Sequence, residues 1–164
     1  CPKPVIAEVN GVATAAGCQL VASCDLAFAS DSSKFATPGV NIGLFCSTPM
    51  VALSRNVSKK EAMKMLLTGD WVSAQEAKRI SLINDHFPED QLKEAVIKIA
   101  SKISAKSQIA VKIGKQAFYD QYEMSLSDAY VFTSRVMTEN SLKNEAKEGI
   151  SAFLDKRHPK WLDN

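Results

Sequence analysis

The sequence contains no run of about 18 consecutive apolar residues, the length that a membrane-spanning helix needs. Its net charge is also small, because 20 Lys and Arg residues against 18 Asp and Glu residues leave a formal charge of +2. The lysines are dispersed and interleaved with acidic residues, so no basic patch favours nucleic acid. The sequence therefore predicts neither a membrane span nor a nucleic-acid partner.

Common signatures for nucleotides and metals are missing too. No Gly-Lys-Ser/Thr follows a glycine-rich turn, which excludes a P-loop, and the dinucleotide fingerprint G-x-G-x-x-G is absent. Cys1, Cys18, Cys24 and Cys46 share no C-x-x-C spacing. This pattern predicts buried free thiols in a reducing compartment and no metal site. A disulfide framework or a zinc site is the alternative.

The residues that are present describe a globular protein. Hydrophobic residues make up 46% of the sequence and charged residues 23%, and 164 residues are enough to bury a core. The chain begins Cys-Pro-Lys-Pro, with no initiator methionine or targeting segment, and enters a predicted strand within four residues. Only three strands are predicted, fewer than a helix-covered sheet normally has. We therefore expect an N-terminal part of the sheet to lie outside this sequence.

An α/β first half and a helical second half are predicted. The strands are short apolar runs bounded by turn residues, namely Val5–Val9, Leu26–Ser30 and Ile80–Asn84. Lys34–Phe45 shows no helical period and is predicted as a loop with a short strand. Apolar spacing and capping signals predict helices at Gly17–Cys24, Ser47–Asn56, Lys59–Leu67, Ala74–Arg79, Glu89–Ile103, Ser107–Tyr122, Ser127–Met137 and Ser141–Leu154.

The stretch from Asn10 to Asp25 offers the clearest candidate for a binding site. Its turn consists of small residues, namely Gly11, Ala13, Ala15, Ala16 and Gly17, and the predicted helix follows directly. Small side chains let a ligand approach the backbone, and the first amides of a helix lack intrahelical acceptors and lie at the positive end of its dipole. The turn is therefore suited to an oxyanion or a polarised carbonyl. Close packing between strand and helix is the alternative explanation.

Several motifs resemble the enoyl-CoA hydratase/isomerase (crotonase) family. They are KPVIAEVNGVA at 3–13, GCQL at 17–20, CDLAFASD at 24–31, FATPGVNIGL at 35–44, LLTG at 66–69 and AQEAK at 74–78. The resemblance implies a β-β-α spiral core, here its C-terminal part at residues 1–88, and a helical trimerisation region at 89–164. It also implies acyl-CoA as ligand or substrate with no further cofactor, and a homotrimer or dimer of trimers. The stretches GLFCSTP and FLDKRHPKW are similar to a mitochondrial member, which implies that location.

The resemblance also assigns site residues. It implies that the amide of Ala16 is one of two that hold the thioester carbonyl, the other lying in the absent N-terminal half. Two catalytic glutamates of the family correspond here to Gln19 and Gly39. Neither an amide nor glycine can transfer a proton, so we expect an acyl-CoA-binding protein with little hydratase activity. A different enzyme using other groups, such as a thioesterase, decarboxylase or isomerase, and a non-catalytic scaffold are the alternatives.

A basic C-terminal segment is the candidate for binding the CoA phosphates. The resemblance places Phe153, Lys156 and Arg157 there, and Lys and Arg suit phosphate recognition. A solvated basic helix end is the alternative. Two further groups are expected to be structural: Cys46, before a helix, as packing, and Asp85-His86 as a solvated turn.

Overall fold

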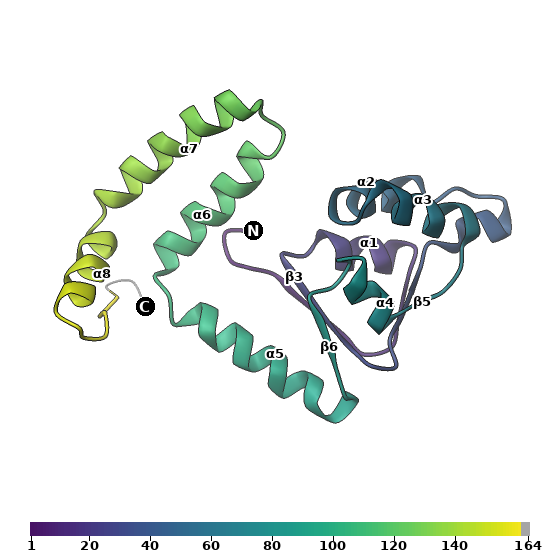
Figure 1. The fold of residues 1–164 in the computed structure, drawn as a ribbon. Helices are drawn as coiled ribbons and strands as arrows, with labels where there is room; N and C mark the ends of the chain where they lie inside the picture. Colours follow the sequence, from purple (N-terminus) through teal and green to yellow (C-terminus); the bar gives the residue numbers. More distant parts are fainter. Residues whose placement is uncertain (162–164) are drawn as a thin grey trace. The chain divides into compact units, whose positions relative to one another are not determined.

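The computed structural model describes residues 1–161 and divides into two compact units (Figure 1). The first unit is Val5–Ala100, and the second comprises Cys1–Pro4 and the chain from Ser101 onward. The change from one unit to the next falls inside helix α5 (Glu89–Ser104). The predicted functional division after residue 88 stays a prediction, and the two units are described separately below.

The first unit contains two small sheets. Strands β1 (Ile6–Val9), β3 (Leu26–Ser30) and β6 (Asp85–Phe87) form a parallel sheet in the order β1-β3-β6. Strands β2 (Val12–Thr14), β4 (Lys34–Ala36) and β5 (Val72–Ser73) form the other, with β2 parallel and β5 antiparallel to β4. The chain thus passes from one sheet to the other between β1 and β2 and again between β3 and β4, as expected of a β-β-α spiral.

Helices follow the strand pairs. They are α1 (Ala16–Ser23), the 3₁₀ helix η1 (Pro38–Ile42), α2 (Ser47–Asn56), α3 (Lys59–Thr68), α4 (Ala74–Arg79) and α5. The capping signals predicted for α3 and α4 are confirmed at Ser58 and Ser73, whose hydroxyls accept hydrogen bonds from the amides of Glu61 and Glu76. The carboxylates of both glutamates bind Arg79. Helix η1 was not predicted, because Lys34–Phe45 reads as turn residues without a helical period.

The predicted strand at Ile80–Asn84 is wrong. Leu82 and Ile83 are apolar because they are buried in the core after α4, not because they pair in a sheet. Asn84 then hydrogen-bonds Ala27 twice, through its backbone amide and its side-chain oxygen, each at 2.8 Å. Only after this junction does the chain become a strand, β6, which starts at Asp85.

The core of the first unit has two parts. The larger lies between the sheets and α1 to α4, and its fully buried members include Phe35, Leu53 and Leu66. The smaller packs Leu92 and Val96 of α5 against Phe28 of β3. These buried side chains fix α1 against the sheets, and each contributes about 1.5–3 kcal/mol relative to exposure.

The second unit is helical, as predicted. It contains α6 (Gln108–Gln121), α7 (Leu126–Ser141) and α8 (Asn144–Leu154). The predicted last helix began too early, because Ser141 is the final residue of α7. Large apolar side chains remain exposed on these helices, among them Leu126, Met137 and Phe153. Among the described residues, no helix is long and apolar enough to cross a membrane.

Candidate active site at the start of helix α1

The bend before α1 is held in an unusual backbone conformation. Ala15, the N-cap residue, has φ 47° and ψ −112°, a region that glycine adopts easily and alanine rarely. Its amide donates to the Ala36 carbonyl at 3.0 Å, and its own carbonyl accepts from Gln19 N at 3.0 Å. The strained peptide is therefore fixed to β4 on one side and to α1 on the other.

Ala16 follows this bend as the first residue of α1. Because an amide at this position has no acceptor four residues earlier in the helix, its N–H is free to bind a ligand. Ala16 is exposed, and the positive end of the helix dipole adds to the attraction for an oxyanion. The role that the resemblance implies for this amide stays a prediction.

Gln19 lies about one turn further along α1 and is half-buried. Its neutral side chain can donate and accept hydrogen bonds, but it cannot take up or release a proton near neutral pH. The structure therefore offers a polar group near the start of α1 without an acid or a base at that position.

Gly39 lies in η1, where added side-chain atoms have no room. A Cβ at this position would lie 2.7 Å from the carbonyl oxygen of Leu44 and 2.9 Å from Sγ of Cys46. The Leu44 amide also donates to the Gly39 carbonyl at 2.9 Å, which folds the segment back on itself. The space that a side chain would enter is therefore filled by backbone and by a thiol.

Cys46 and Cys18 belong to one buried cluster. Burial, and to a lesser extent the nearby Cys46, raise the pKa of the Cys18 thiol to about 11. Cys46 is the N-cap residue of α2 and makes no side-chain capping bond. None of the four cysteines is in a disulfide. The predicted burial is confirmed for Cys18 and Cys46 but is wrong for Cys1, which is exposed, and only partly right for Cys24, which is half-buried.

The Asp85-His86 pair is not the solvated turn that the sequence suggested. Both residues belong to β6, and the His86 ring contacts the carboxylate of Asp31, just after β3. Asp85 binds Lys78 Nζ at 2.6 Å, which lowers the pKa of that carboxyl. The Lys78–Asp85 ion pair and the His86–Asp31 contact connect the ends of neighbouring elements, and no sequence pattern brings residues 31 and 86 together.

In the second unit, the C-terminal segment folds back on α8. Arg157 donates to both carboxylate oxygens of Glu148, at 2.7 and 3.0 Å, and more weakly to Asp155. The guanidinium lowers the pKa of Glu148 to about 2. Lys156 has φ 53° and an exposed side chain, and Phe153 is 81% exposed. Of the three predicted CoA-binding residues, Arg157 thus already has an anionic partner.

Beside the bend, a groove of about 470 Å³ runs along β1 and α1. It is lined mainly by the backbone and side chains of residues 5–13, with Gly17, Leu20, Val21 and Cys24 from the helix side. Within residues 1–161 there is no group of three or more His, Cys, Asp or Glu that could hold a metal ion. The fold is that of a crotonase-fold protein, in which the N-terminus of α1 lies beside this groove.

The chain belongs to the enoyl-CoA hydratase/isomerase family, which its residues 1–164 match. It is 56% identical over 160 residues to the enoyl-CoA hydratase domain-containing protein 3, mitochondrial, of Rattus norvegicus, covering 98% of this chain and 53% of that protein. It is 36% identical over 162 residues to the enoyl-CoA hydratase, mitochondrial, of Pongo abelii, covering 98% of this chain and 56% of that protein. The chain therefore spans about half the length of the curated relatives it matches.

Solved structures agree with this assignment. The crystal structure of human enoyl Coenzyme A hydratase domain-containing protein 3 superimposes with a TM-score of 0.95 at 56% identity, covering 98% of this chain and 63% of that one. An enoyl-CoA hydratase from Mycobacterium smegmatis gives a TM-score of 0.96 at 51% identity, covering 98% and 62%. The crotonase fold predicted from the motifs is thus confirmed.

Proposed function

We propose that this chain is part of an acyl-CoA-binding protein of mitochondrial fatty-acid metabolism that hydrates enoyl-CoA weakly or not at all. The observation that carries the proposal is the free amide of Ala16, presented at the first turn of α1 behind a peptide held at positive φ. A thioester carbonyl is a ligand that such an amide can polarise. Relatives named as enoyl-CoA hydratases and as mitochondrial support both the ligand class and the location.

The low hydratase activity follows from two positions. Adding water to an enoyl double bond requires groups that take and give protons, and Gln19 cannot do either. At Gly39 the side chain is absent altogether, and the Leu44 carbonyl occupies the space that an acidic side chain would need. An acid cannot be restored at residue 39 unless residues 44–46 move.

The amide of Ala16 supplies half of an oxyanion hole, and the resemblance assigns the other amide to the part of the family fold outside this chain. Removing one donor from a complete hole typically slows a reaction by about 100-fold or more. The proposed function therefore refers to the protein that contains both halves of the fold, assembled as a homotrimer or a dimer of trimers.

Phe153 and Lys156 are the proposed contacts for the CoA part of the ligand, and Arg157 has a positioning role. Lys156 is exposed and has no ion pair in the described structure, so it can meet a phosphate. Arg157 is held by Glu148, and it fixes the segment that carries Lys156. The Arg157 guanidinium would bind a phosphate directly only if it left that carboxylate.

Calorimetry and turnover on the full-length protein test the proposal. Butyryl-CoA should bind, and an Ala16→Pro variant should bind it more weakly, because proline lacks the N–H. An Ala15→Gly change in the same variant relieves the restriction that proline places on the residue before it. Circular dichroism checks that the variant is folded. Equal binding by both proteins would contradict the role of this amide, and no binding of any acyl-CoA would leave only the scaffold alternative.

Turnover distinguishes a binding protein from an enzyme. Crotonyl-CoA should be hydrated at near-background rates, and Gln19→Glu should raise the rate while Gln19→Met should not. Hydration by the wild type at rates ordinary for enzymes, about 1–1000 per second, would show that other groups replace the missing acids. Release of free CoA from saturated acyl-CoA would instead favour the thioesterase alternative.

A further inference from the structure

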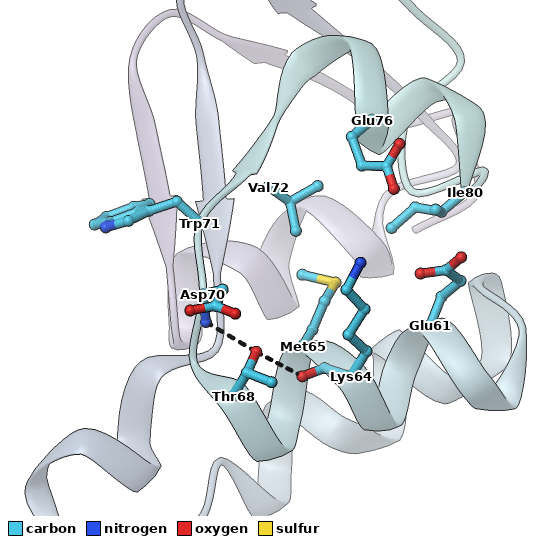
Figure 2. Close-up of a pocket in the computed structure, with 9 residues that line it drawn as sticks. All are labelled: Glu61, Lys64, Met65, Thr68, Asp70, Trp71, Val72, Glu76 and Ile80. Atoms are coloured by element: carbon cyan, nitrogen blue, oxygen red, sulfur yellow. Dashed lines mark hydrogen bonds between the residues drawn. The ribbon is translucent and has the colours of Figure 1, made fainter.

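A second pocket, away from the bend at Ala16, lies between α3, β5 and α4 (Figure 2). Its volume is about 440 Å³, which is within the range of about 300–1000 Å³ typical of small-molecule sites. None of its lining residues contributes to the groove along β1 and α1. The proposed function leaves this pocket without a role.

The floor of the pocket is apolar. Met65 and Ile80 are buried core residues, and the half-buried Val72 lies near Met65 (Figure 2). Trp71 also lines the pocket and remains 57% exposed. Such a surface binds the aliphatic or aromatic body of a ligand rather than a hydrated ion.

One wall is fixed by an arginine outside the lining. Arg79 donates to Glu61 Oε1 and to both carboxylate oxygens of Glu76, each at 2.7 Å. Its hydrogen bonds lower the pKa of Glu76, so this carboxylate stays ionised at neutral pH. The two glutamates are therefore held in place and already share a cation.

Two charged groups of the pocket have no such partner. Neither the Lys64 ammonium nor the Asp70 carboxylate makes a hydrogen bond or ion pair with another side chain in the part of the chain that the structure describes. In Figure 2, the end of Lys64 points into the space between Val72 and Glu76, whereas Asp70 lies beside Thr68 and Trp71. Lys64 is close enough to Glu76 for its charge to help lower the pKa of that carboxyl, but it forms no ion pair with it. The pocket thus presents a cation and an anion, neither of them in a hydrogen bond or ion pair with another described side chain, at separate places over an apolar floor.

These charges discriminate between classes of ligand. A simple anion at Lys64 would also face the Glu76 carboxylate, which is near that ammonium, and a simple cation at Asp70 would make no use of Lys64. A molecule with both charges can pair its acidic end with Lys64 and its basic end with Asp70. We propose that this pocket binds a zwitterion with a compact apolar body, the chemistry of an apolar α-amino acid.

Four probes test the proposal on the full chain by following the methyl and indole NMR signals of Met65, Ile80 and Trp71. Leucine carries both charges and the apolar body. Leucinamide lacks the anion, 4-methylpentanoate lacks the cation, and glycine lacks the apolar body. Leucine should shift these signals and bind at least about tenfold more tightly than each of the others. Binding of leucinamide or 4-methylpentanoate as tight as that of leucine would overturn the proposal.

Matched variants assign the two charges. Lys64→Met and Asp70→Asn should each weaken leucine binding about tenfold, the loss of about 1.4 kcal/mol expected for one charge-assisted contact. Lys60→Met, on the same helix but outside the lining, should bind leucine like the wild type. Leucinamide should be unaffected or improved by Lys64→Met, because it has no carboxylate to lose. Unchanged leucine binding in both pocket variants, or no shift of the three signals with leucine, would refute the site.

Discussion

The Cys46 side chain leaves no room for a side chain at Gly39, because its Sγ lies 2.9 Å from the position that a Cβ on Gly39 would take. The Leu44 carbonyl oxygen is closer still, at 2.7 Å. The glycine is therefore part of a local packing arrangement in which residues 44–46 fill the space beside η1. The glycine at residue 39 and the path of residues 44–46 are thus one structural feature.

This packing predicts the effect of the smallest possible side chain. Gly39→Ala should lower the free energy of unfolding by about 1–3 kcal/mol, as overpacking does in a closed site. Adding Cys46→Ala to that variant should recover only part of the loss, because the Leu44 carbonyl remains. Urea unfolding measures both effects. Gly17→Ala is the matched control, since its Cβ would meet only the Ala13 Cβ at 3.9 Å. A Gly39→Ala protein as stable as the control would show that the segment moves freely.

The conformation of Ala15 predicts an opposite effect. At φ 47° alanine is strained and glycine is not, so Ala15→Gly should raise the free energy of unfolding by about 1 kcal/mol. Ala16→Gly should lower it instead, because Ala16 is helical and glycine costs entropy there. Thermal unfolding of the two variants provides the comparison. A loss of stability in both would mean that the positive φ at Ala15 carries no strain.

Much of this architecture could be predicted from the sequence, and the failures have physical causes. Capping boxes predicted the starts of α3 and α4 because they are local hydrogen-bond patterns. Strand β5 has only two residues, too few for a period. The apolar residues before β6 were mistaken for a strand because burial after a helix and burial in a sheet demand the same residue types.

The site shows the same division. The bend at Ala15 and Ala16 could be located from the sequence, because a backbone that a ligand can approach closely needs small residues, and a run of small residues is visible in the sequence. The lack of space beside Gly39 could not be predicted from the sequence, since it depends on the path of residues 44–46. The pocket beside Lys64 and Asp70 also joins residues from three elements. Only the folded chain shows that these residues share one cavity.

Thiol reactivity should separate the cysteines into two classes. Cys1 is exposed and Cys24 half-buried, whereas Cys18 and Cys46 are buried. Because burial raises the pKa of Cys18 to about 11, its reactive thiolate is scarce at pH 8. A chromogenic disulfide reagent should therefore modify Cys1 rapidly and Cys24 more slowly, and label Cys18 and Cys46 only after denaturant is added. Peptide mass spectrometry identifies the sites, and prompt labelling of Cys18 in the native protein would contradict its placement.

Acid should release the C-terminal segment from α8. The pKa of Glu148 falls from 4.5 to about 2, first through its hydrogen bonds with Arg157 and then through the Lys160 amide. A carboxyl with a lowered pKa in the folded state stabilises that state above its ordinary pKa and loses this contribution as pH falls toward the folded value. Docking of the segment should therefore be complete above about pH 4.5 and weaken progressively down to about pH 2.

Trp161 reports this docking, because its indole N–H donates to the Ala105 carbonyl at 2.9 Å. In a Trp71→Phe background it is the remaining tryptophan of the two in the sequence, so its fluorescence follows the segment alone. Glu148→Gln should shift the emission at neutral pH toward that of a solvated indole and abolish the acid transition. Asp155→Asn should do so less, because Asp155 accepts only a longer contact of 3.4 Å from Arg157. The same acid transition in wild type and Glu148→Gln would show that another carboxyl holds the segment.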